Sequence, residues 1–181
     1  MRRSAAVALT IAALAAPVVD VGTPRAAAAV LPGFTDTRVA SLGASTGIAG
    51  LPDGRIVVLE QAGRVRLLRN DSLLPTPALT LDIAGCNSGE RGLLGVAVDP
   101  DFLATGFVYL YYTRPSPGAP GDCVNRASRF TMFGDAIDPA SEVILVDNIS
   151  SNNRNHNGGD LEIGGDGFLY ISVGDAGADP R

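Results

Sequence analysis

Two residues near the end of the chain have the types and spacing that acid–base chemistry needs. His156 is the only histidine of the 181 residues, and Asp175 follows it in a second polar, glycine-rich segment. Residues 163–171 between them read as a turn and then a strand. A histidine at the start of one strand and an aspartate at the end of its hairpin partner can lie side by side, and the carboxylate then orients the imidazole as a base near neutral pH. The alternative is a histidine in a surface loop and an aspartate in a turn.

The elements that must position this pair are predicted to be strands. Short apolar segments bounded by Gly, Pro, Asn and Asp are typical of strands joined by turns, and no amphipathic helix follows residue 29. The apolar run 92–98 is typical of a fully buried strand. The expected strands cover residues 55–60, 64–68, 92–98, 107–113, 127–133, 142–146, 161–163 and 168–173.

A divergent internal repeat predicts how these strands are grouped. An Asp-Gly turn followed by an apolar strand occurs at residues 51–58 and again at 164–171, with a looser copy at 100–110. Turn-plus-strand units that start roughly 50–60 residues apart, with four short strands each, are typical of β-propeller blades. We expect an all-β fold with one complete blade over about residues 92–146 and part of a blade on either side, two to three blades in all. The first strands, near 92–98 and 160–163, should be innermost. A β-sandwich is the alternative.

The two ends of the chain suggest an exported protein and a longer parent. Residues 1–29 resemble a secretory signal, with Arg2 and Arg3, an apolar run over 5–16 and small residues at 26–29. The apolar run is too short to span a bilayer comfortably, although a retained N-terminal anchor is the alternative. The expected domain, residues 30–181, stops just after Asp175 without a closing element. We therefore expect an N-terminal part of a secreted or periplasmic protein.

Charge and cysteine content narrow the classes further. The net charge of -5 and the pI of about 4.7 leave no basic stripe for phosphates, so nucleic acid and strongly anionic membrane surfaces are not expected partners. Cys86 and Cys123 are the only cysteines and lie in loop-like sequence. In an exported chain they predict one disulfide, with two unpaired thiols as the alternative. Neither cysteine has the spacing of a zinc site.

Four ordered blocks resemble the glucose/sorbosone dehydrogenase family, soluble quinoproteins related to pyrroloquinoline quinone (PQQ) glucose dehydrogenase and aldose sugar dehydrogenases. The resemblance covers about residues 34–181. The blocks are Glu90-Arg91-Gly92-Leu93-Leu94-Gly95-Val96-Ala97-Val98-Asp99-Pro100-Asp101-Phe102, Asn125-Arg126-Ala127-Ser128-Arg129-Phe130, Asn155-His156-Asn157-Gly158-Gly159-Asp160-Leu161 and Gly165-Asp166-Gly167-Phe168-Leu169-Tyr170-Ile171-Ser172-Val173-Gly174-Asp175.

The resemblance implies a six-bladed propeller with PQQ over its central channel. His156 then takes the hydroxyl proton from C1 of an aldose while hydride passes to the quinone, and Asp175 orients the imidazole. Asn155 matches a sugar-contacting position, with a turn residue as the alternative. An external electron acceptor would reoxidise the cofactor. The chain alone, with an open ring, is expected to be inactive.

The resemblance also implies a cofactor contact at Glu90 and Arg91. The glucose dehydrogenase branch has glutamine at the position of Glu90. A carboxylate beside the three carboxyl groups of PQQ is electrostatically less favourable than an amide, and Arg91, a metal ion or a raised pKa would have to compensate. The alternative for Glu90 is an acid in a surface loop.

Calcium is the second cofactor that the resemblance implies, with ligands expected mostly outside this chain. Asp99, Asp101 and Asp166 carry oxygen ligands of the calcium type but lack a calcium-loop spacing, so we interpret them as turn caps. Two functions remain open at this point: an exported PQQ-dependent aldose dehydrogenase, and a non-enzymatic extracellular propeller that binds protein or carbohydrate.

Overall fold

The computed structural model describes residues 30–119 and 122–177. The chain divides into two units, Met1–Thr37 and Arg38–Arg181. In the first unit, the described residues 30–37 contain a turn and neither helix nor strand. The predicted signal segment, residues 1–29, lies outside the described residues.

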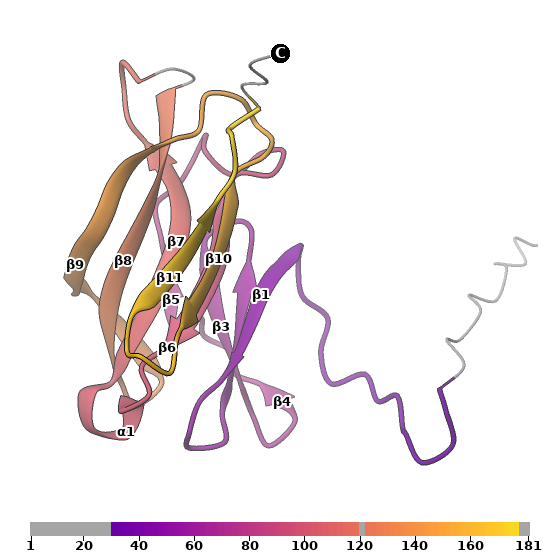
Figure 1. Ribbon diagram of the computed structural model, residues 1–181. Helices are drawn as coiled ribbons and strands as arrows, with labels where there is room; N and C mark the ends of the chain where they lie inside the picture. The colour runs from indigo at the N-terminus through magenta and orange to yellow at the C-terminus, as the bar shows by residue number, and fades with distance from the viewer. Residues whose placement is uncertain (1–29, 120–121, 178–181) are drawn as a thin grey trace, which may run out of the picture. The chain divides into compact units, whose positions relative to one another are not determined.

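The second unit is built from antiparallel strands (Figure 1). Its elements are β1 (Ser45–Gly50), β2 (Ile56–Glu60), β3 (Arg64–Arg69), β4 (Ser72–Leu73), β5 (Leu79–Thr80), β6 (Leu93–Val98), α1 (Phe102–Thr105), β7 (Phe107–Pro115), β8 (Cys123–Phe133), β9 (Ala136–Ser150), β10 (Gly158–Ile163) and β11 (Leu169–Val173). Within the described residues, no helix has the length and hydropathy needed to cross a membrane.

Two consecutive sheets follow the strand order of propeller blades. The first sheet runs β1-β2-β3-β4, and β5 also pairs with β3, so that β4 and β5 together occupy the position of a fourth strand. The second sheet runs β6-β7-β8-β9. Strands β10 and β11 form a two-stranded antiparallel sheet that begins the same pattern again. Sequential antiparallel strands in repeated four-strand units are the architecture of a β-propeller.

The first strands of the three sheets pack against one another. Strand β6 contacts β1 on one side and β10 on the other. The approach of β6 to β10 is limited by two backbones, because a Cβ at Gly95 would lie 1.8 Å from the carbonyl oxygen of Gly159. These strands are therefore innermost, as the sequence predicted.

Two apolar clusters fill the space between sheets. The larger cluster joins the first and second sheets and includes Leu59, Leu67, Leu93, Leu110 and Phe130. The smaller cluster joins the second sheet to the β10–β11 pair, around the buried side chains of Tyr111, Ala127 and Leu161. Burial of a large apolar side chain stabilises the folded chain by about 1.5–3 kcal/mol, so these clusters are the main force that holds adjacent blades together.

The eight predicted strands are all present, and the complete blade expected over about 92–146 is the β6–β9 sheet. The first blade is also complete, whereas we expected only part of it. Strand β1 (Ser45–Gly50) was not predicted because its Ser, Thr, Gly and Ala residues lack an apolar alternation. The repeated Asp-Gly turns have equivalent places, one between β1 and β2 and one between β10 and β11, with Gly54 and Gly167 at φ values of 87° and 81°.

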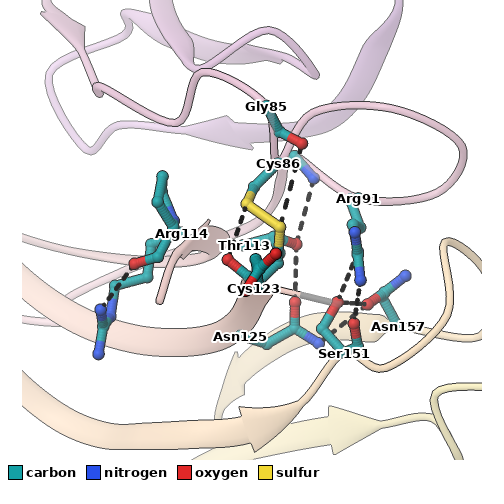
Figure 2. Close-up of a disulfide and its surroundings, with 12 residues drawn as sticks. Gly85, Cys86, Arg91, Thr113, Arg114, Cys123, Asn125, Ser151 and Asn157 are labelled. Atoms are coloured by element: carbon teal, nitrogen blue, oxygen red, sulfur yellow. Dashed lines mark hydrogen bonds between the residues drawn. A yellow bond between two sulfur atoms is a disulfide. The ribbon is translucent and has the colours of Figure 1, made fainter. Parts of the chain in front are cut away.

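The predicted disulfide is present and joins the segment before β6 to the start of β8 (Figure 2). The Cα atoms of Cys86 and Cys123 are 5.9 Å apart, and both residues are buried. Closing a loop with a sequence separation of 37 stabilises the folded state by about 3–4 kcal/mol in the chain-entropy model.

We predict that replacing Gly95 with alanine strongly destabilises the contact between β6 and β10. The added Cβ meets a backbone carbonyl that side-chain rotation cannot move, and overpacking of this kind costs about 1–3 kcal/mol or more. The matched control is Gly50→Ala, where a Cβ meets no atom within 4 Å. Urea unfolding followed by circular dichroism measures both variants. Equal midpoints for the two would contradict the close packing of β6 on β10.

A second prediction concerns the disulfide. The double variant Cys86→Ser/Cys123→Ser should lose about 3–4 kcal/mol of unfolding free energy, and the reduced wild type should lose a similar amount. Non-reducing mass spectrometry of protein secreted from an oxidising host checks the bond itself. Two free thiols in that sample would show that the bridge does not form.

Candidate active site

The β10–β11 pair brings His156 and Asp175 together. Gly158, two residues after His156, pairs with Val173, two residues before Asp175, so the start of one strand lies beside the end of its partner. The Nδ1 atom of His156 and the Oδ1 atom of Asp175 are 2.9 Å apart. The spatial pairing predicted from the sequence is therefore confirmed, and the catalytic role remains a prediction.

Glycines allow the two segments to approach this closely. A Cβ at Gly174 would lie 2.0 Å from the carbonyl oxygen of His156, and one at Gly158 would lie 2.7 Å from the amide nitrogen of Gly174. The His156 carbonyl accepts a hydrogen bond from the Ala176 amide at 3.0 Å. His156 itself has a φ of 55°, in the left-handed region that non-glycine residues seldom adopt. Such strain is common where a fold fixes a functional side chain.

The pair is open to solvent, and hydrogen bonds stabilise the charged form of Asp175. The side chains of His156 and Asp175 are 57% and 50% exposed. The Gly177 amide donates to Oδ1 of Asp175 at 2.9 Å, and this bond, together with the contact to His156, lowers the pKa of Asp175. Asp175 is therefore a carboxylate at neutral pH. When the proton of His156 lies on Nδ1, facing Asp175, the lone pair of Nε2 is left to accept a proton.

A buried polar network includes two residues of the histidine loop, the residues 151–157 between β9 and β10. Figure 2 shows these two side chains, Ser151 and Asn157, beside that of Asn125. The Oδ1 atom of Asn157 accepts hydrogen bonds from Asn125 Nδ2 at 3.1 Å and from Ser151 Oγ at 2.7 Å. The Asn157 carbonyl accepts one from the hydroxyl of Tyr111 at 3.0 Å. Burial raises the pKa of Tyr111 to about 12, so this hydroxyl stays protonated and keeps donating. The residue after His156 is thus fixed from beneath by strands β7 and β8.

Arg91 belongs to this network. It is only 4% exposed, and its guanidinium donates to the hydroxyl of Ser151 at 3.0 Å and to the Ser151 carbonyl. Burial, with a smaller contribution from the positive charge of Arg154, lowers the pKa of Arg91, which nevertheless stays protonated. No carboxylate of the described residues forms an ion pair with it. The predicted contact of Arg91 with a cofactor stays a prediction.

The other two predicted site residues lie beside the pair. A carboxylate oxygen of Glu90 accepts a hydrogen bond from the backbone amide of His156 at 2.5 Å. Asn155 is exposed, and its Oδ1 lies 2.3 Å from the point where a Cβ on Gly177 would be. The predicted roles of Glu90 at a cofactor and of Asn155 at a sugar stay predictions. The structure brings both residues to the histidine.

Of the three aspartates considered as calcium ligands, Asp99 and Asp166 cap turns and Asp101 does not. Asp99 accepts the Asp101 amide at 2.8 Å, and Asp166 accepts the Phe168 amide at 3.1 Å, which confirms both as turn caps. Asp101 precedes α1 but its side chain makes no capping hydrogen bond there, so its interpretation as a cap was wrong. Among residues 30–119 and 122–177, no three His, Cys, Asp or Glu side chains are grouped as a metal site.

Sequence reasoning missed the buried polar residues that support the loop, Tyr111, Asn125, Ser151 and Asn157. Asn125, Ser151 and Asn157 lie in loop-like sequence, where polar residues are expected to be exposed. Tyr111 lies in a predicted strand, but periodicity gives no sign that its hydroxyl meets the other three from a distant part of the chain. The one available signal was that Asn125 and Asn157 both fall inside the blocks that resemble a known family.

The fold and site together define a blade-built propeller protein with a carboxylate-oriented histidine at the ends of its strands. The family model for glucose/sorbosone dehydrogenases matches residues 42–181, and the chain belongs to this family. The solved structures that it resembles confirm the β-propeller fold. A putative glucose dehydrogenase of Thermus thermophilus is 30% identical with a TM-score of 0.66, covering 76% of this chain and 39% of that one. The PQQ-bound aldose sugar dehydrogenase of Streptomyces coelicolor is 26% identical with a TM-score of 0.60, covering 76% and 40%.

Relatives of known sequence include both an enzyme and a protein named for an interaction. The quinoprotein glucose dehydrogenase B of Acinetobacter calcoaceticus is 28% identical over 133 residues, which are 70% of this chain and 27% of the enzyme. The Hedgehog-interacting protein of Mus musculus is 31% identical over 132 residues, which are 67% of this chain and 19% of that protein. The chain therefore spans well under half the length of the proteins it matches.

The lowered pKa of Asp175 gives a testable titration. We expect its carboxyl carbon, followed by ¹³C NMR, to titrate below the ordinary aspartate value of 3.8. Because the folded pKa is lower than the unfolded one, the contribution of Asp175 to stability is present above the unfolded pKa and is lost as the pH falls through the folded pKa. In His156→Ala the midpoint should rise but stay below the ordinary value, since the Gly177 amide remains. Asp175→Asn assigns the signal, and a midpoint at the ordinary value in wild type would contradict the two hydrogen bonds.

Proposed function

We propose that the intact protein is an exported PQQ-dependent dehydrogenase that oxidises the C1 hydroxyl of aldose sugars. The observation that carries the proposal is the 2.9 Å contact between His156 Nδ1 and Asp175 Oδ1, on an exposed surface of a chain that belongs to the glucose/sorbosone dehydrogenase family. The similarity to a quinoprotein glucose dehydrogenase and to a PQQ-bound aldose sugar dehydrogenase supports PQQ as the cofactor and a sugar as the substrate.

His156 is the general base of this reaction. Its Nε2 atom accepts the proton of the C1 hydroxyl, and Asp175 stabilises the imidazolium that results while holding the ring in orientation. The C1–H bond breaks with its electron pair, and the carbon becomes a carbonyl. PQQ, when bound, supplies the acceptor for that hydride, and an external electron acceptor regenerates it. Asn155, adjacent to the base and exposed, would donate to a sugar hydroxyl.

Arg91 supplies a positive charge that would attract an anionic quinone. The guanidinium of Arg91 is buried without a carboxylate partner among the described residues, so its positive field is available to the carboxyl groups of PQQ. The carboxylate of Glu90 accepts the His156 amide, and this hydrogen bond does not remove the unfavourable interaction that we expected with those groups. Arg91, whose guanidinium is buried against Ser151, would act on the cofactor through its positive charge. Calcium, with ligands outside the described residues, remains part of the proposal.

Export is supported by the disulfide, since such bonds persist in oxidising compartments. Residues 1–29 would direct it as a secretory signal. A second function, an extracellular propeller that binds a protein or carbohydrate without catalysis, is favoured by the similarity to the mouse Hedgehog-interacting protein, of which the chain covers 19%.

We predict that His156→Ala lowers kcat/KM of the intact, PQQ-loaded protein by about 10²–10⁴-fold, the usual contribution of a general base. PQQ affinity should be unchanged, because the imidazole does not hold the cofactor. Asp175→Asn should cost less, since the base itself remains. Dye-linked oxidation of a panel of aldoses measures the rates, and absorbance titration measures PQQ binding.

Asp160→Asn is the matched control, because Asp160 is an exposed aspartate of the same strand pair whose side chain makes no hydrogen bond to any described residue. Full activity of His156→Ala would assign the base to another residue. A wild-type protein that neither binds PQQ nor oxidises any aldose would leave the binding module as the better function.

A further inference from the structure

Glu90 forms two hydrogen bonds with the histidine loop. Its backbone amide donates to the carbonyl oxygen of Arg154 at 2.7 Å, and its side-chain Oε2 accepts the backbone amide of His156 at 2.5 Å. The two bonds are separated by one residue of the loop. They come from the segment before β6, which is distant in sequence from the loop between β9 and β10. Such a contact between separate segments fixes a loop that has no strand partner of its own.

The segment that carries Glu90, residues 89–91, is held in turn by hydrogen bonds from the first sheet. The side-chain amide of Gln61, which follows β2, donates to the carbonyl oxygens of Gly89 at 2.6 Å and Arg91 at 2.8 Å. Gly89 has a φ of 67°, and a Cβ there would lie 2.5 Å from the carbonyl oxygen of Arg154. Only glycine lets the Glu90 backbone come this close to the loop. The first blade therefore fixes Glu90, and Glu90 fixes the loop.

The hydrogen bond from the His156 amide to Glu90 holds a residue in an unfavourable backbone conformation. A left-handed φ of 55° at His156 is less stable than the right-handed form for a residue with a Cβ. The peptide groups on both sides of the residue are held, the amide by Glu90 and the carbonyl by Ala176. A hydrogen bond to a carboxylate is stronger than one to a neutral acceptor. Of the two hydrogen bonds that hold the His156 backbone, only the one to Glu90 therefore involves a charged group.

We propose that Glu90 is a positioning residue, which holds the His156 peptide in the left-handed conformation from which the imidazole meets Asp175. This assignment rests on the proposed function insofar as it gives His156 a catalytic task. The two hydrogen bonds from Glu90 to the loop are present in the described residues whatever the function. What position 90 must supply is a side-chain oxygen that accepts an amide hydrogen, and glutamine supplies one where alanine does not.

The test compares Glu90→Ala with Glu90→Gln in the intact protein. We expect Glu90→Ala to lower kcat by about 10- to 100-fold, the scale of a misplaced catalytic group, with KM and PQQ affinity nearly unchanged. Glu90→Gln should restore most of the rate. Glu162→Ala, which removes an exposed carboxylate from β10 and the same unit of charge, is the control and should match wild type. Equal activity of Glu90→Ala and wild type would overturn the proposal, as would a common rise in PQQ affinity in both Glu90 variants without loss of kcat.

A second readout does not need turnover. In protein labelled with ¹⁵N-histidine, the backbone amide of His156 is assigned by its loss in His156→Gln. We expect this signal to move upfield in Glu90→Ala, with several-fold faster hydrogen exchange, and to stay near its wild-type position in Glu90→Gln. If the wild type shows no dehydrogenase activity, the proposed function fails while this measurement still decides whether Glu90 holds the loop. An unchanged His156 amide signal in Glu90→Ala would overturn the proposal that Glu90 holds this amide, whatever the activity.

Discussion

The antiparallel pairing of β10 with β11 is the constraint on which the site depends. It places His156 and Asp175 on neighbouring strand ends, and their backbones come within reach only because residues 158 and 174 are glycines. Strand β10 of this pair also packs on β6, where Gly95 faces the carbonyl of Gly159. Blade packing and site geometry thus share one set of close backbone contacts. A change that loosens the blades would also separate the base from the carboxylate that orients it.

The histidine loop is held from three directions by groups with different chemistry. Beneath it, a buried network of neutral amides and hydroxyls fixes Asn157 through strands β7 and β8. Beside it, the Asp175 segment binds the His156 carbonyl and the ring. From the segment that the first blade anchors, Glu90 binds the His156 amide. The imidazole of His156 stays exposed. The backbone of the loop is therefore held by hydrogen bonds while the side chain remains accessible to a substrate.

The sequence predicted the strands with strong apolar patterns, the disulfide and the pairing of His156 with Asp175. Each rests on local signals: apolar runs, two cysteines in a chain that we expected to be exported, and a hairpin that separates the pair. It failed for β1, whose small residues carry no alternation, and for Asn157 and its partners, whose burial depends on strands distant in sequence. It proposed Glu90 as a candidate site residue but not its contact with the His156 amide, because the direction of a side chain in a loop follows from tertiary packing alone.

The central claim is that the Asp175-oriented imidazole faces the reacting hydroxyl of a sugar. A crystal structure of the intact protein with PQQ and an aldose tests it most directly. The account predicts the Nε2 atom of His156 within about 2.6–3.2 Å of the C1 hydroxyl oxygen, the reach of a general base, with Nδ1 still bound to Asp175. A sugar bound elsewhere, or an imidazole turned away from Asp175 in that complex, would contradict it.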